Sequence, residues 1–425
     1  MAGARPLPWK VSASELLHCT KPHLSGWNRH VKIKLCGAAL FRTYRSIGMA
    51  IADRAENGTF AASSRAIAVT HCRCGNRKWD TGFDNNNTGF GRRFGMFDAG
   101  RPVARLQGHA GGCRNMSLFL VTGGAGFIGS HLCDALVDRG DTVRVLDDLS
   151  TGHRTNLPPG TTLIEGDVAD PATVDAAIAG VDGCFHLAAI ASVEKGVTDW
   201  FGTHRTNQTG TIAVFDAIRR QSSRIPVVYA SSAAVYGDAA TVPVSESGPA
   251  APLSAYGADK YGCELHARVA SHVHGIPTAG LRFFNVYGPR QDPRSPYSGV
   301  ISIFCERIAA GAPIAIFGDG QQTRDFVYVG DVVAALCAAM ALRPAGSPVF
   351  NICTGVPTSV AELASLIASL AGKPLHAETR PPRAGEIRHS LGVPELANRT
   401  LGLRERVTLR HGLSNVLAWM TGSAG

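Results

Sequence analysis

A short apolar segment followed by several glycines is the feature that most constrains this chain. The segment from Leu118 to Thr122 predicts a parallel strand that is buried on both faces. The glycines that follow it are Gly123, Gly124, Gly126 and Gly129. Glycine allows a tight turn and lets the main chain approach a ligand closely, and a helix that begins near Phe127 would direct the positive end of its dipole at a diphosphate. The pattern predicts a nucleotide-binding strand, turn and helix.

A second strand and its last residue indicate which nucleotide binds. The segment from Thr142 to Leu146 is typical of a strand, and Asp147 follows it, 18 residues after Gly129. A carboxylate at this position can accept hydrogen bonds from both hydroxyls of an adenosine ribose. Asp147 and Asp148 would repel a 2′-phosphate, and no arginine follows immediately to attract one. The sequence therefore favours NAD over NADP as the cofactor.

Charge is distributed unevenly along the 425 residues. Residues 1–115 contain 18 Lys or Arg and 6 Asp or Glu, whereas the remainder contains 24 and 27. The net charge of +9 therefore arises upstream of the glycines and does not indicate that the rest of the chain binds nucleic acid or a membrane. Eleven cysteines without a regular framework, and no obvious secretory signal, are typical of a reducing compartment, so we expect a cytoplasmic protein.

Strands and helices are predicted to alternate from Ser117 onward. This alternation predicts a doubly wound α/β fold, in which a parallel Rossmann sheet has helices on both faces and binds ligands beyond the carboxyl ends of its strands. After Asn285 a Pro/Gly-rich segment leads to further strands and an amphipathic helix, which predict a smaller α/β substrate domain. We expect an NAD-binding domain over residues 116–285 and a mainly substrate-binding domain over residues 286–425, with some segments returning to the first domain.

The first 115 residues differ from the rest. Their apolar residues keep neither period 2 nor period 3.6 for long, which leaves too little patterned apolar surface to offset an ordering cost of about 1–2 kcal/mol per residue. We therefore expect a largely disordered basic extension, or a misassigned one that precedes a true start at Met116. His71, Cys72 and Cys74 lack a second pair at zinc-like spacing, so we expect no metal.

Three residues are candidates for the chemistry. Tyr256 and Lys260 are four residues apart, which places them one above the other on a helix face. A lysine cation and an oxidised nicotinamide both favour the phenolate form that a tyrosine needs to act as a base. Ser231 and Ser232 end the preceding strand, where a hydroxyl can bind the alcohol being oxidised and relay its proton. Each motif alone also fits an ordinary surface or strand-end residue, whereas together they predict a catalytic set of Ser232, Tyr256 and Lys260.

With these motifs in this order, residues 117 to about 415 resemble the extended short-chain dehydrogenase/reductase family, and within it the UDP-sugar 4-epimerases. The resemblance implies a homodimeric enzyme that uses NAD to invert carbon 4 of a UDP-sugar through a transient 4-keto sugar. The implied cofactor residues are Gly123, Gly126, Phe127, Ile128, Gly129, Asp147, Asp148, Asp167, Val168, Leu187, Ala188, Ala189, Asn207, Tyr256 and Lys260. The implied substrate residues are Ser192, Ser232, Asn285, Arg324, Arg383, Glu386 and Ser390.

The resemblance also assigns roles within the substrate set. Asn285, Arg324 and Arg383 would contact the diphosphate, and Glu386 would bind the uridine ribose. Arginine forks suit a diphosphate, and a carboxylate suits vicinal hydroxyls.

Two departures from related enzymes narrow the expected activity. The 4,6-dehydratases carry an Asp-Glu pair where this chain has Ala233 and Ala234, and the missing glutamate also counts against a UDP-glucuronate decarboxylase. Epimerases restricted to glucose and galactose carry a tyrosine where this chain has Ser390, which resembles epimerases that accept N-acetylated sugars. A plain loop serine at this position is an equally open alternative.

Three other functions stay open at the level of sequence. The first is another nucleotide-sugar oxidoreductase of the same family, such as a reductase. The second is a non-catalytic, NAD-binding regulatory protein. The third is a nucleic-acid or zinc module within residues 1–115, which we rank lowest because that stretch lacks a recognisable scaffold.

Overall fold

The computed structural model describes residues 116–222, 224–295, 299–383, 387–403 and 406–422, with Val193 described by its backbone only. These ranges belong to one compact unit of the chain. The expected properties of residues 1–115, including the possible metal ligands, lie outside the described residues. None of the helices in the described part of the chain has both the length and the apolar character needed to cross a membrane.

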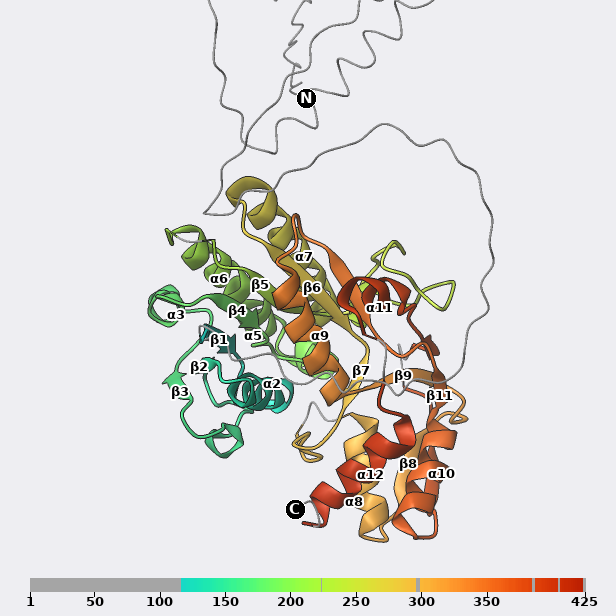
Figure 1. The fold of residues 1–425 in the computed structure, drawn as a ribbon. Coiled ribbons are helices and arrows are strands. Elements are labelled where there is room, and N and C mark those ends of the chain that lie inside the picture. The colour runs from blue at the N-terminus through green and yellow to red at the C-terminus, as the bar shows by residue number, and fades with distance from the viewer. Residues whose placement is uncertain (1–115, 223, 296–298, 384–386, 404–405, 423–425) are drawn as a thin grey trace, which may run out of the picture. The chain divides into compact units, whose positions relative to one another are not determined.

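A seven-stranded sheet in which every strand pair is parallel forms the larger part of the fold (Figure 1). Its strands are β1 (Leu118–Thr122), β2 (Thr142–Asp147), β3 (Thr162–Glu165), β4 (Gly183–His186), β5 (Val227–Ser232), β6 (Thr278–Phe283) and β10 (Val349–Ile352). The strand order is β10-β6-β5-β4-β1-β2-β3, so the order reverses beside β1. Ligands of such sheets bind at this reversal, beyond the carboxyl ends of the strands. The doubly wound α/β fold that the sequence predicts is confirmed.

Helices cover both faces of this sheet because its strands are apolar on both sides. One face packs against α2 (Phe127–Asp138), α9 (Val329–Leu342) and α11 (Glu395–Leu401). The other face packs against α3 (Pro171–Ile178), α6 (Gly210–Arg219) and α7 (Ala255–His274). Neighbouring residues of one strand divide between the faces, as Val121 and Leu120 do.

The helical segment from Trp200 to Arg219 is not uniform. It consists of α5 (Trp200–His204), a π-helical segment η2 (Arg205–Thr209) and α6, and it follows the short helix α4 (Val193–Thr198). A π-helical segment shifts the register of the side chains by one residue, and such segments often occur at functional sites. Here the segment contains the buried side chains of Asn207 and Gln208.

Smaller sheets follow residue 284, and their labelled strands lie toward the lower right of Figure 1. One contains β7 (Asn285–Tyr287), β9 (Thr323–Tyr328), β11 (Pro357–Ser359) and β13 (His389–Ser390), and a second pairs β8 (Ile314–Phe317) with β12 (Ala377–Arg380). Helices α8 (Val300–Ala309), α10 (Val360–Ala371) and α12 (Leu409–Met420) share one apolar core with them. The short 3-10 helices are η1 (Arg154–Asn156) and η3 (Ala233–Tyr236).

Candidate functional site

The turn between β1 and α2 accepts only glycine at two of its positions. Gly123 has φ +70°, and a Cβ added there would come within 2.7 Å of the Ala188 amide nitrogen. A Cβ on Gly129 would collide with the Gly123 carbonyl oxygen and approach the Gly124 Cα at 2.7 Å. The helix α2 then begins at Phe127, and no side chain caps its N-terminus. These features fit the diphosphate of a dinucleotide, since the main chain is exposed at close range and helix N–H groups point toward it.

The carboxylate of Asp147 lies at the end of β2, next to this turn. Its two oxygens accept hydrogen bonds from the amides of Ala125 and Leu149, each at 2.9 Å. Burial raises the pKa of Asp147, and these two hydrogen bonds oppose that effect. Each carboxylate oxygen keeps further acceptor capacity, which fits the hydroxyls of a ribose. The neighbouring Asp148 is exposed and accepts hydrogen bonds from Ser150.

The remaining cofactor candidates surround the same edge of the sheet. Asp167 follows β3, accepts a hydrogen bond from the Ala169 amide at 2.7 Å and forms an ion pair with Arg205. Val168 is buried, and Ile128 packs against the core beneath α2. The segment from Leu187 to Ala189 follows β4, and Asn207 holds the next residue from η2.

The catalytic candidates come together between β5 and α7. Ser232 ends β5, and its hydroxyl oxygen accepts a hydrogen bond from the Ala234 amide at 3.1 Å. Tyr256 lies in the first turn of α7, and the buried Lys260 lies one turn later with its Nζ 5.9 Å from the centre of the tyrosine ring. Ser231 instead donates a hydrogen bond to the buried carboxylate of Glu264 at 2.5 Å. Ser232 is therefore the serine available for chemistry.

A cavity of about 480 Å³ contains both Ser232 and Tyr256. The predicted substrate residues that line it are Ser232, Asn285, Arg324, Arg383 and Ser390. Ser192 is not among its lining residues; the Ser192 hydroxyl caps α4 by accepting a hydrogen bond from the Lys195 amide at 3.0 Å. Glu386 lies outside the described residues. Among the lining residues that the structure describes there is no Asp or Glu, and Ala233 and Ala234 form part of the wall.

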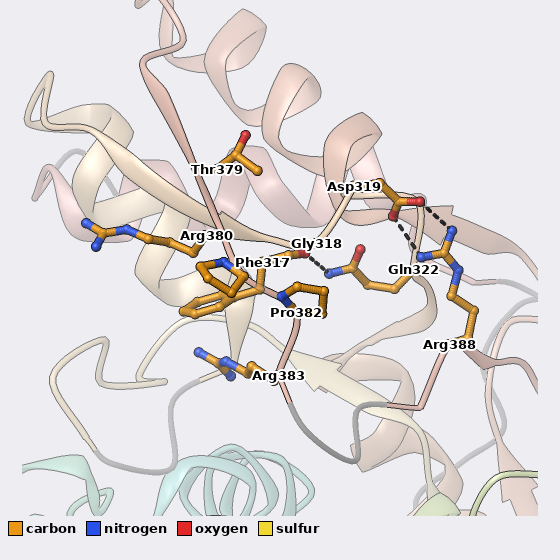
Figure 2. A pocket seen from close by; sticks show the side chains of 10 residues that line it. Phe317, Gly318, Asp319, Gln322, Thr379, Arg380, Pro382, Arg383 and Arg388 are labelled. Atoms are coloured by element: carbon orange, nitrogen blue, oxygen red, sulfur yellow. Dashed lines mark hydrogen bonds and ion pairs between the residues drawn. The ribbon is translucent and has the colours of Figure 1, made fainter.

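A second cavity, of about 700 Å³, lies between β8, β12 and the segment that follows β12 (Figure 2). The guanidinium carbon of Arg383 lies 4.1 Å from the centre of the Phe317 ring, and Figure 2 shows the two side chains together. Asp319 and Arg388 form a two-pronged ion pair with both contacts at 2.7 Å, which lowers the pKa of Asp319 to about 2. Arg383 lines both cavities, so they adjoin at this residue.

Phe317 and Arg388 are functional candidates that the sequence analysis did not single out. Phe317 ends β8, and Arg388 lies between Glu386 and Ser390, which that analysis did name. An aromatic residue at the end of a strand before Gly-Asp-Gly was a usable indication of a flat binding surface. The described residues contain no cluster of three or more His, Cys, Asp or Glu side chains that could hold a metal ion.

Comparison with known proteins supports a cofactor-binding enzyme fold. A family model described as the NAD dependent epimerase/dehydratase family matches residues 119–353. The putative UDP-glucose 4-epimerase of Methanocaldococcus jannaschii is 38% identical over 305 residues, which cover 71% of this chain and 98% of that protein.

Two solved structures are similar over most of their length. A UDP-glucose 4-epimerase of Thermotoga maritima, solved with UDP-glucose, is 35% identical with a TM-score of 0.69, and the match covers 72% of this chain and 100% of that one. A UDP-N-acetylglucosamine 4-epimerase of Methanobrevibacter ruminantium is 32% identical with a TM-score of 0.69, covering 73% and 99%. The glycine turn, the Asp147 carboxylate and these matches agree: this chain belongs to the NAD-dependent epimerase/dehydratase family, and its cofactor is NAD.

Proposed function

We propose that this protein is a 4-epimerase of UDP-sugars. The observation that carries the proposal is the cavity of about 480 Å³, which combines Ser232 and Tyr256 with two arginines, Arg324 and Arg383. A hydroxyl pair beside a buried lysine suits the oxidation of an alcohol, and paired arginines suit a diphosphate. The absence of a carboxylate among the described lining residues disfavours a dehydratase, which needs an acid to expel a hydroxyl.

The residues of the chain would act on the sugar 4-hydroxyl. Tyr256, as phenolate, removes the hydroxyl proton, and the cation of Lys260 stabilises the phenolate because the lysine is only 3% exposed. Ser232 donates a hydrogen bond to the oxygen that loses the proton. Bound NAD supplies a hydride acceptor, and afterwards a hydride donor, at carbon 4. Arg324 and Arg383 hold the diphosphate while the keto sugar turns its other face, and Tyr256 then returns the proton.

The larger cavity would hold the nucleotide end of the substrate. We propose that the Phe317 ring, over which the Arg383 guanidinium lies, contacts the base, and Arg383 connects this cavity to the one that contains Tyr256. Uridine is the proposed base because the two structural relatives described above carry UDP-sugars in their names. We propose that Ser390 leaves room for an N-acetyl group, so that the enzyme accepts both plain and N-acetylated hexoses.

We also propose that the enzyme is a homodimer that associates through α5 and α7. Leu265, Val269 and Val273 are spaced at i, i+4 and i+8 on α7 and are exposed. Trp200 and Phe201 on α5 are exposed as well, and α5 packs against α7. An exposed apolar stripe of this kind is typical of a helix that packs against another element.

The decisive experiment is incubation of the full chain with UDP-glucose, UDP-galactose and their N-acetyl forms, followed by chromatographic separation of the epimers. Tyr256→Phe should retain NAD and lose roughly 10²- to 10⁴-fold in turnover, the usual contribution of a positioned acid/base. Tyr261→Phe, on the same helix but outside the cavity lining, is the matched control and should keep its turnover. Near-normal epimerisation by Tyr256→Phe, or net consumption of NADH or NADPH, would refute the proposal.

A further inference from the structure

The segment from Leu187 to Ile190 is held at both of its ends by buried polar groups. At its start, the Thr122 hydroxyl oxygen accepts hydrogen bonds from the Leu187 and Ala188 amides, each at 3.2 Å. At its end, the Asn207 side chain accepts from the Ile190 amide at 2.8 Å and donates to the Ile190 carbonyl at 3.2 Å. The main chain of this segment lies against the glycine turn, since a Cβ on Gly123 would come within 2.8 Å of the Ala188 Cα.

His186 connects these two anchors. Its Nδ1 lies 2.8 Å from the Thr122 hydroxyl, and its Nε2 lies 2.9 Å from the Thr211 hydroxyl. The Thr211 hydroxyl in turn donates to the main-chain carbonyl oxygen of Asn207 at 2.6 Å. His186 is 4% exposed and the other three residues are buried, so water does not compete for these hydrogen bonds.

Counting protons determines the direction of every hydrogen bond in this chain of contacts. A hydroxyl has one proton to donate and two lone pairs with which to accept. The Thr211 hydroxyl donates its one proton to the Asn207 main-chain carbonyl oxygen at 2.6 Å, so it can only accept from His186 Nε2. The proton of the neutral imidazole is therefore on Nε2, which donates to Thr211. Nδ1 then accepts from the Thr122 hydroxyl, whose oxygen accepts from the Ala188 amide and shares the Leu187 amide with the Thr122 main-chain carbonyl oxygen, which lies 3.1 Å from that amide.

We propose that His186, as a neutral imidazole with its proton on Nε2, is a positioning residue that couples Thr122 to Asn207 and so holds the Leu187–Ile190 segment against the cofactor turn. The inference rests on the NAD cofactor of the family and is independent of the sugar that the enzyme accepts. An imidazolium would carry a proton on both nitrogens, so Nδ1 could no longer accept the proton that the Thr122 hydroxyl donates. Burial, and then the nearby charge of Lys260, lower the pKa of His186 to about 3, in agreement with the neutral form.

The first test reads the tautomer directly. In full-length protein labelled with ¹⁵N at histidine, the long-range ¹H–¹⁵N spectrum at pH 7 should contain a neutral ring protonated on Nε2, and His186→Asn should remove that signal. A ring protonated on Nδ1, or an imidazolium at pH 7, would overturn the proposal because either form reverses the hydrogen bond with Thr122.

The second test measures coupling to the cofactor without using catalysis. His186→Asn and Thr211→Val should each weaken NAD binding on the order of tenfold in titrations of the apoprotein, as expected for a broken buried hydrogen bond. Their double variant should bind NAD no more weakly than either single variant, because the same connection is already broken. Thr278→Val is the matched control: Thr278 is a fully buried threonine on β6, away from the segment, and its loss should leave NAD affinity unchanged.

The Thr278→Val control also distinguishes a role of His186 in positioning the segment from a general loss of stability. If His186→Asn lowers Tm but binds NAD as tightly as Thr278→Val does, His186 does not position the segment. Additive losses in the double variant would equally refute the coupling. Should His186→Asn fail to fold, the affinity of Thr211→Val and the tautomer of the unmodified protein still decide the question.

Discussion

At position 390 a serine lines the cavity that contains Ser232 and Tyr256. It lies on β13 in register with Arg324 on β9, so a larger side chain here would project beside the proposed diphosphate contact. We expect Ser390→Tyr to reduce kcat/KM for UDP-N-acetylhexosamines at least about tenfold relative to UDP-glucose and UDP-galactose, since the pocket loses the space for the acetamido group. Ser390→Ala should leave that ratio unchanged. Equal losses of Ser390→Tyr on both substrate types would contradict a role in pocket size.

A second prediction at the residue scale concerns acid stability. A histidine in an unfolded chain titrates near pH 6.5, whereas the pKa of His186 is lowered to about 3 in the fold, first by burial and then by Lys260. Between these values the unfolded state binds more protons, so the free energy of unfolding falls as pH drops below 6.5, by up to about 1.4 kcal/mol per pH unit. Urea unfolding from pH 7.5 to 5 should show this slope, and His186→Asn should reduce it.

Other titrating groups also contribute to the pH dependence of the free energy of unfolding, and their contributions must be separated from that of His186. Burial also lowers the pKa of His131, which therefore contributes with the same sign. Burial raises the pKa of Asp147 and Asp325, whose contribution has the opposite sign and arises nearer the acid end. The free energy of unfolding is plotted against pH for both proteins, and the His186→Asn curve is subtracted from that of the unmodified protein. The subtraction removes the contributions of His131, Asp147 and Asp325. An unchanged slope in the variant would show that His186 does not stay neutral in the fold.

At the scale of elements, the β1–α2 unit depends on how closely its turn packs. A methyl group on Gly129 would collide with the main chain of Gly123 and Gly124, whereas one on Gly126 would meet only the Gly123 carbonyl oxygen at 3.3 Å. We expect Gly129→Ala to lower the free energy of unfolding by about 1–3 kcal/mol and to abolish NAD retention. Gly126→Ala is the matched comparison and should lose clearly less stability. A Gly129→Ala protein with normal NAD content would show that the turn can relax.

At the scale of the whole molecule, the exposed stripe on α7 predicts association. Val269 is 52% exposed in the middle of that stripe, where a second copy would bury it. We expect sedimentation to show a dimer, and Val269→Asp to shift it toward monomer because an unpaired carboxylate in an apolar interface is costly. Val356→Asp, at a somewhat more exposed valine (60%) outside these helices, should leave the dimer intact. A monomeric unmodified protein would refute the proposed interface.

The elements that the sequence predicted well are those that local pattern determines. The first strand has the predicted bounds, α2 begins at the predicted Phe127, and the helix that carries Tyr256 and Lys260 begins one residue before the tyrosine. Apolar periodicity, glycine at a tight turn and a capping serine at Ser254 act over a few residues, so they can be recognised without neighbours. The parallel sheet follows because alternating strands and helices connect with one hand. The sequence by itself therefore determined the fold class, the NAD turn and the candidates for chemistry.

Only the tertiary structure decided which of those candidate residues line the cavity and which make other contacts. In the structure Ser231 donates to Glu264, whereas Ser232 lines the cavity. Neighbouring side chains of a strand point to opposite faces of the sheet, but only the packed structure shows which residues lie against each face. The π-helical segment η2 between α5 and α6 places Asn207 against Ile190. The link from Thr122 through His186 to Asn207 joins segments far apart in the chain. Contacts between residues far apart in the chain depend on how the helices and strands pack. A short stretch of sequence therefore does not predict which side chains will be partners.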